Sequence, residues 1–94
     1  MFVVTLSFAD KAKAPQFMEG HNAWIRQGFD DGVFLLAGSL QPQAGGAILA
    51  HGITRADLER RVRDDPFVAE GVVSPAILEI APGRVDDRLA FLKA

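Results

Sequence analysis

The stretch Phe-Val-Val-Thr-Leu-Ser-Phe at residues 2–8 alternates large apolar side chains with smaller or polar ones. The large groups occupy the even positions, and this period of two predicts a β-strand with one face against a core. The segment lacks a basic region and a small-residue cleavage site, and Asp10 and Lys11 interrupt it. It therefore predicts a first strand rather than a signal peptide or a membrane span.

The hydrophobic period changes after Pro15. From there to about Asp31, apolar side chains follow a spacing of 3.6 residues, while polar residues such as Asn22 fall on the opposite side. This pattern predicts an amphipathic helix. Gly32 is expected to end it, because glycine tolerates the left-handed conformation that helix C-termini often require.

The next segment, Val33–Leu40, is a nearly continuous apolar run of strand length. Such a run is typical of a strand covered on both faces, so we expect it to be central. Proline and glycine punctuate residues 41–45, and residues 46–51 are again apolar, which predicts a β-hairpin.

Thr54 is a good helix N-cap, with Asp57 three residues later, so a second helix is expected to begin there. It must stop before Pro66, because the proline ring disfavours helical geometry in Asp65. A last strand is expected from Val72 to Ile80, at an edge because it contains a proline.

The order β-α-β-β-α-β predicts an α+β, ferredoxin-like domain with an antiparallel sheet and both helices on one face. We expect a single domain over residues 1–94, with a core at 1–82 and a short helical tail at 83–94. Because two helices cover only one face, the other should meet a second sheet or a ligand. This favours a homodimer or a higher homo-oligomer.

Composition narrows the classes of function. The net charge is −2 and the chain has no cysteine. A nucleic-acid partner is disfavoured, since phosphate neutralisation needs a net basic surface. Thiol nucleophiles, disulfides and thiolate metal sites are absent, so we expect a cytoplasmic protein.

His21 lies on the apolar stripe of the first predicted helix, where an imidazole needs a hydrogen-bond partner. One interpretation is an edge histidine that binds a backbone carbonyl or water. The other pairs it with Asp65, because the two helices lie side by side in this topology; a carboxylate would then fix the tautomer of the ring. Asp65 itself could instead form a local turn or cap before Pro66.

Two other side chains are weaker candidates. Trp24 faces the same way as His21, which favours a core position, although its indole N–H could line a pocket. His51 is expected at the surface, and no metal-ligand spacing surrounds it.

An ordered set of short motifs spans most of the chain. The set consists of His-Asn-Ala-Trp-Ile at 21–25 followed by Gly28 and Gly32, Leu-Ala-Gly-Ser-Leu at 36–40, Gly45-Gly46, and Asp-Pro-Phe at 65–67 with Gly71. In this order and spacing, the set resembles the YCII-related family.

The resemblance implies a dimeric α+β barrel, similar to muconolactone isomerase and related small enzymes, with a histidine and an aspartate in the active site. These match His21 and Asp65 here. The resemblance implies no cofactor and no metal. We add Trp24, Ser39 and Phe67 as candidate substrate-binding residues; Ser39 stands where many relatives have proline.

These observations favour a small cofactor-independent enzyme that uses a His-Asp pair as general acid and base. The reaction would be an isomerisation or an elimination of the lyase type, on a small cyclic or aromatic-derived molecule. The alternative is a non-catalytic module that binds a small ligand or serves as a dimeric accessory. The sequence leaves open whether the protein is an enzyme at all. We expect a small-molecule ligand, and neither nucleic acid nor a membrane as partner.

Overall fold

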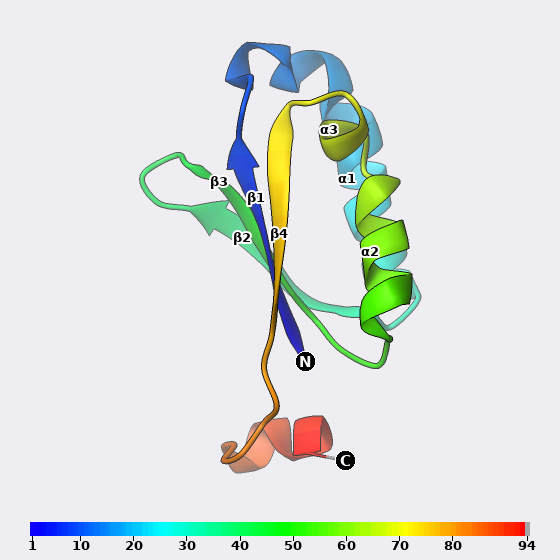
Figure 1. The fold of residues 1–94 in the computed structure, drawn as a ribbon, viewed down its shortest axis with the longest axis vertical. Helices are drawn as coiled ribbons and strands as arrows, with labels where there is room; N and C mark the ends of the chain where they lie inside the picture. Colours follow the sequence, from blue (N-terminus) through cyan, green and yellow to red (C-terminus); the bar gives the residue numbers. More distant parts are fainter. Residues whose placement is uncertain (94) are drawn as a thin grey trace.

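A four-stranded antiparallel sheet carries helices on one of its faces in the computed structural model, which describes residues 1–93 (Figure 1). The elements in chain order are β1 (Phe2–Phe8), the 3-10 turn η1 (Lys11–Lys13), α1 (Ala14–Asp30), β2 (Phe34–Leu40), β3 (Gly45–Ala50), α2 (Arg55–Arg63), α3 (Pro66–Ala69), β4 (Val73–Glu79) and the 3-10 helix η2 (Asp87–Lys93). This order and the antiparallel pairing confirm the predicted α+β, ferredoxin-like class.

The strands are arranged in the order β2-β3-β1-β4. β1 lies inside the sheet and pairs antiparallel with β3 and β4, as Val4 does with Ile48 and Ile77. β4 is at an edge, as Pro75 predicted. The expectation that Val33–Leu40 forms a central strand is wrong, because β3 folds back between it and β1.

β2 is apolar on both faces although it is not a central strand. Phe34 is buried in the core, whereas Leu36 on the other face is 52% exposed. On that open face Leu78 and Ile80 are exposed as well. One chain therefore leaves an apolar sheet face uncovered, and β2 is apolar there without being enclosed.

The core lies between the sheet and the helices. Phe2, Val4 and Leu6 of β1 pack against Leu58 and Val62 of α2 in one buried cluster. This is the face predicted by the alternation of residues 2–8.

The start of α2 is capped as predicted: the Thr54 side chain accepts a hydrogen bond from the Asp57 amide at 3.1 Å. The helix ends at Arg63, before Pro66, as expected. Pro66 then begins the short helix α3, which was not predicted. Proline is favourable in a first helical turn, where its missing N–H is not needed.

An ion pair joins the C-terminal end of α1 to α2, where Arg61 donates to Asp31 at 2.9 Å. Hydrogen bonds from Gln27 and from Arg61 hold the pKa of the Asp31 carboxyl below its ordinary value of 3.8. The two helices are thus tied together at one end, beside the core.

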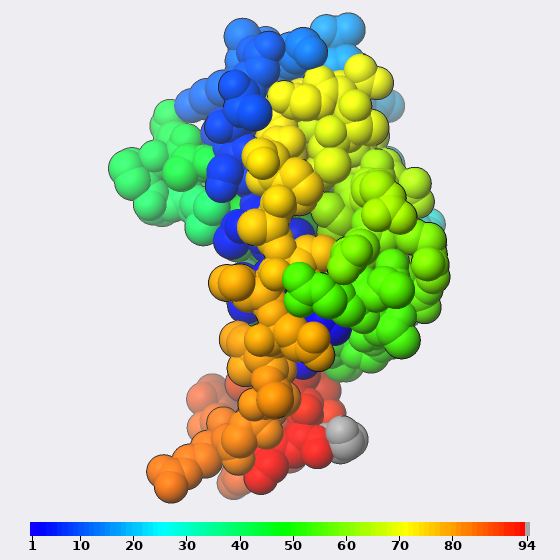
Figure 2. All heavy atoms as spheres, viewed as in Figure 1, coloured from blue at the N-terminus to red at the C-terminus, as the bar shows by residue number. Residues whose placement is uncertain are grey.

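The tail leaves β4 and stands off from the helices and most of the sheet (Figure 2). It forms η2, with a kink at Leu89, where an ordinary helix was expected. Its Phe91 ring meets His51 edge-on at 5.4 Å, which half-buries that histidine. Within residues 1–93, no helix is long and apolar enough to cross a membrane.

Candidate functional site

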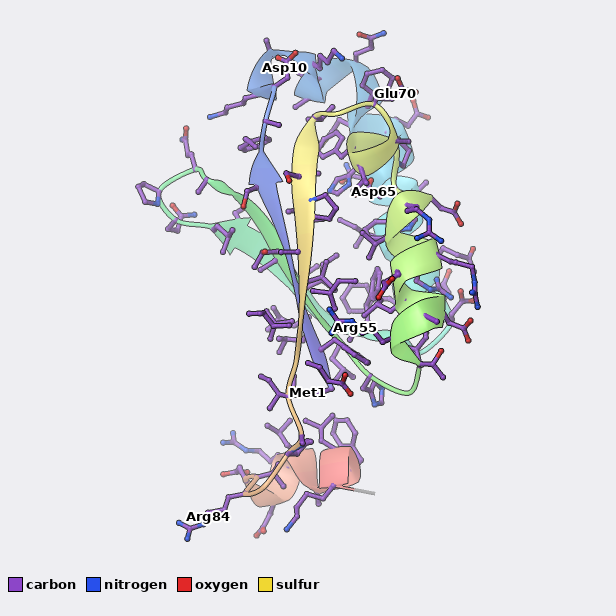
Figure 3. All side chains as sticks on the ribbon, in the orientation of Figure 1. Met1, Asp10, Arg55, Asp65, Glu70 and Arg84 are labelled. Carbon is purple, nitrogen blue, oxygen red and sulfur yellow. The ribbon has the colours of Figure 1, made fainter. Side chains whose placement is uncertain are left out.

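His21 and Asp65 are in direct contact. Nδ1 of His21 lies 2.8 Å from Oδ1 of Asp65, although the two residues are 44 positions apart in the chain. Asp65 is fully buried and the His21 side chain is 12% exposed. Figure 3 shows Asp65 at the junction of α2 and α3, on the side that faces α1. The predicted contact between the two side chains is present.

The local sequence explains the position of Asp65. Its backbone is extended, as the following Pro66 requires, and it forms the N-cap of α3. Its Oδ1 also accepts a hydrogen bond from the Phe67 amide at 3.0 Å. The cap and the histidine contact were considered as alternatives from the sequence, yet the same oxygen serves both.

The pairing determines which ring nitrogen can react. An ionised carboxylate only accepts hydrogen bonds, so Nδ1 of a neutral His21 must carry the proton. Nε2 then holds the free lone pair, and no residue from 1 to 93 forms a hydrogen bond with it. His21 is therefore arranged as a base whose free nitrogen is available to a bound molecule.

Aromatic stacking holds the imidazole plane. The Phe67 ring is parallel to it, with centroids 3.9 Å apart and planes at 4°, and Trp24 lies 6.0 Å away on α1. The backbone approach is also close: a Cβ on Gly20 would lie 3.0 Å from Cγ of Pro66. The missing side chain at position 20 thus leaves room for Pro66 of α3 beside α1.

A cavity of about 480 Å³ lies beside His21, between α1 and the β2–β3 hairpin. Its floor consists of small residues, and its walls are mainly apolar and aromatic. The lining residues are Leu6, Phe8, Met18, His21, Asn22, Ile25, Phe29, Ala37, Gly38, Ser39, Gly45, Gly46, Ala47, Ile48, Phe67 and Val73. The size is in the range of small-molecule pockets, about 300–1,000 Å³.

The sheet register explains why this space is empty. Gly46 pairs with both Ser39 and Leu6, so these three residues share a row on the helix-covered face. Only Leu6 contributes a large side chain, and Ala37 in the neighbouring row is small too. The β2–β3 half of the sheet therefore cannot fill the space beneath α1.

The candidate residues separate into three groups. His21, Ser39 and Phe67 line the cavity, and Asp65 lies behind His21. Trp24 does not line it: its indole N–H donates to the Arg61 carbonyl at 2.9 Å, and its ring packs edge-on against Phe34. A core role was the favoured interpretation for this tryptophan, and the structure places it there.

Asn22 was assigned to the polar, outer side of the helix, and its side chain is indeed exposed, but its place in the cavity was missed. It lines the cavity together with Met18, Ile25 and Phe29. These residues recur at three- and four-residue spacings and form a second stripe, about 100° around the helix from the core stripe. The helical spacing of Met18, Ile25 and Phe29 could be seen in the sequence, but the polar Asn22 among them made this stripe hard to recognise.

The side chains that line the cavity are largely uncharged. Apart from His21, its only polar side chains are those of Asn22 and Ser39, and it contains no lysine, arginine, aspartate or glutamate. Over residues 1–93 there is also no cluster of three or more histidine or acidic side chains suited to a metal ion. The arrangement can orient a small molecule and move a proton at Nε2.

The fold and the site together define a class: a ferredoxin-like α+β domain with a buried aspartate, a histidine and an apolar cavity. One solved structure similar to this chain is a 5-chloro-2-hydroxyhydroquinone dehydrochlorinase from Burkholderia phenoliruptrix, in complex with 2,5-dihydroxybenzoquinone. The two align with a TM-score of 0.63 and 10% sequence identity, over 85% of this chain and 93% of the other. No protein-family model and no curated protein sequence matches this chain. The likeness supports the fold.

Proposed function

We propose that this protein is a cofactor-independent acid–base enzyme that acts on a small cyclic or aromatic-derived molecule. The observation that carries the proposal is the His21–Asp65 hydrogen bond at 2.8 Å beside an apolar cavity. It leaves one histidine nitrogen free where a ligand could bind. His21 would be the base and then the acid, and Asp65 would fix its tautomer.

The reaction class follows from what one histidine can do. In an isomerisation, Nε2 takes a proton from one carbon of the substrate, the electron pair of that C–H bond shifts the double bond, and Nε2 returns the proton to another carbon. In an elimination, the same pair forms the new π bond, the leaving group departs with its own bonding pair, and the proton passes to water. Both are balanced without a cofactor.

The structural neighbour supports a ring-shaped substrate. That protein is named for dehydrochlorination of a hydroxyhydroquinone and holds a dihydroxybenzoquinone. We extend this chemical class to the cavity here, where Phe8, Phe29 and Phe67 provide aromatic walls. Phe67 and Ser39 would contact the substrate, while Trp24 would support the site from the core.

Deuterium exchange tests the proposal. Wild-type protein is incubated in D₂O with a panel of hydroxylated rings and unsaturated lactones, and proton NMR follows each carbon-bound hydrogen. We expect protein-dependent exchange or conversion of at least one compound. If compounds bind but none exchanges or reacts faster than in a protein-free sample, the acid–base proposal is wrong and the protein is a ligand-binding module.

We further propose that the chain is related to the YCII-related family and forms a cytoplasmic homodimer through the open sheet face. The motif order from residue 21 to residue 71 supports the relationship. The exposed side chains of Leu36, Leu78 and Ile80 support the pairing, because an apolar surface of this kind is stabilised by removal from water.

Light scattering at tens of micromolar is expected to give about twice the chain mass of 10.1 kDa. Leu78→Asp should shift the protein toward monomer, since it places a charge within the proposed interface. Leu89→Asp, an exposed leucine of the tail, should leave the dimer intact. A monomeric wild type would contradict the pairing, and dissociation by the tail variant alone would assign the interface to η2.

A further inference from the structure

We propose that the cavity selects an uncharged flat ring that carries hydrogen-bonding oxygens at two separate positions, and that Asn22 and Ser39 bind the second oxygen. This inference rests on the proposed function, since it describes the substrate of the same site. What it adds is the charge of the ligand, its two-ended polarity and two specificity-determining residues.

Asp65 places a buried carboxylate directly behind His21. Its Oδ1 accepts hydrogen bonds from His21 and from the Phe67 amide. Its other oxygen, Oδ2, is buried and meets no hydrogen-bond donor among residues 1–93. Among residues 1–93, the carboxylate therefore receives hydrogen bonds only from His21 and the Phe67 amide, both at Oδ1.

An anionic ligand at Nε2 would be unfavourable. A carboxylate or phosphate at Nε2 would face the buried Asp65 charge across a single imidazole ring, and like charges at such range disfavour one another. No lysine or arginine lines the cavity to offset the ligand's charge. Of the nearby basic side chains, Lys11 binds Gln43 and Arg61 binds Asp31. An uncharged ligand avoids this cost, because burial of an unpaired charge is strongly unfavourable.

Besides His21, Asn22 and Ser39 are the polar side chains that line the cavity. Asn22 comes from α1 and Ser39 from β2, so the cavity has a polar side chain on each of two walls in addition to His21. A hydroxyl and a primary amide can each donate and accept. Together they can bind either a hydroxyl or a carbonyl oxygen, and so would tolerate a quinol and its quinone.

The floor of the cavity is formed by small residues of β2 and β3. Ala37 and Gly46 on the helix-covered face present little side-chain volume beneath the ligand, and the Phe67 ring lies beside it, stacked on His21. Such a small-residue floor leaves room for a ring to lie between the strand pair and the helix. The walls of the cavity would fix the plane of the ligand ring, and the polar contacts at its two ends would fix its rotation within that plane.

Titration calorimetry with a matched pair of ligands tests the charge. 4-Hydroxybenzamide and 4-hydroxybenzoate have nearly the same size, and only the second is anionic at pH 7.5. We expect the amide to bind at least tenfold more tightly to the wild-type protein. Equal or tighter binding of the benzoate would overturn the selection of uncharged ligands.

A second pair tests the two-ended polarity. Hydroquinone carries two oxygens and phenol one. Ser39→Ala and Asn22→Ala should each weaken hydroquinone binding about five- to tenfold, the effect of one lost hydrogen bond, and leave phenol binding nearly unchanged. Ser74→Ala, an exposed serine of β4 outside the lining, is the matched control and should change neither. If both cavity variants bind hydroquinone like the wild type, the assignment of these residues is wrong.

The two proposals can fail separately. Deuterium exchange observed only with anionic rings would contradict the selection of uncharged ligands and support the acid–base chemistry. Suppose instead that uncharged rings with two oxygens bind selectively but show no exchange or conversion. This result would support the selection of uncharged ligands and would overturn the proposed acid–base catalysis. Circular dichroism of each variant confirms that the compared proteins are folded.

Discussion

Replacing His21 by glutamine is expected to lower turnover of an accepted substrate by about 10²–10⁴-fold, the usual contribution of a positioned acid or base. Ligand affinity should change little, because the glutamine amide can still form a hydrogen bond from a similar position. His51→Gln is the matched control: this histidine contacts Phe91 and does not line the cavity, so its variant should keep wild-type turnover. Steady-state kinetics together with calorimetric binding separate the two effects.

Asp65→Asn examines the same dyad from its other side. Asparagine caps helices as well as aspartate does, so α3 should be retained. Its amide N–H₂ could reach Nδ1 only by a flip that gives up the cap, because Oδ1 serves both contacts. Without the flip, the variant still removes the negative charge that stabilises the imidazolium formed when His21 takes a proton. We expect a loss similar to that of His21→Gln, and the double variant should be no worse than either single variant.

The outcomes distinguish a chemical from a structural dyad. If His21→Gln loses affinity rather than turnover, the histidine is an anchor and the ligand-binding alternative is supported. If Asp65→Asn keeps full turnover, the aspartate acts only as a cap for α3, and tautomer control by Asp65 is wrong.

The second large effect concerns stability. Gly28 of α1 lies directly against the ring of Phe34, and a Cβ there would lie 2.1 Å from Cδ2 and 2.2 Å from Cε2 of the phenylalanine. Alanine would improve helix propensity by about 1 kcal/mol, but the overlap forces the helix or the ring to move. We expect Gly28→Ala to lower the free energy of unfolding by roughly 3 kcal/mol net.

Urea titration followed by circular dichroism measures this change. Gly20→Ala is the matched control in the same helix: its Cβ would meet one atom of Pro66 at 3.0 Å, so its effect should be much smaller. Phe34→Leu in the Gly28→Ala background should recover part of the loss, because the smaller side chain relieves the overlap. An unchanged midpoint for Gly28→Ala would show that α1 can shift without cost, contrary to the close packing described above.

Much of the fold could be predicted because its signals are local. Alternation at residues 2–8, the Thr54 cap, the break before Pro66 and the edge strand marked by Pro75 each depend on conformational preferences of a few neighbouring residues. The contact between His21 and Asp65 was one of two interpretations that the sequence left open, and it was suggested by the ferredoxin-like order, which places the two helices together.

The errors arose where distant segments decide the outcome. The position of β2 at an edge depends on which strand β3 joins, and an apolar run looks the same whether it is enclosed or left open for a partner. The place of Asn22 in the cavity was missed because a helical pattern gives relative directions and not the position of the helix over the sheet. Trp24 and His21 share one stripe, yet only His21 reaches the cavity.

The sequence by itself determined the four strands, the two longer helices and their order, and it named His21 and Asp65 as candidates, because spacing, capping and proline geometry act within short stretches of chain. Only the tertiary structure decided that a cavity exists beside His21. That cavity depends on strand register, which brings Ser39 and Gly46 into one row beneath α1, and on the second stripe of the helix that covers them. Such an arrangement of small residues from separate strands leaves no periodic signal in the chain.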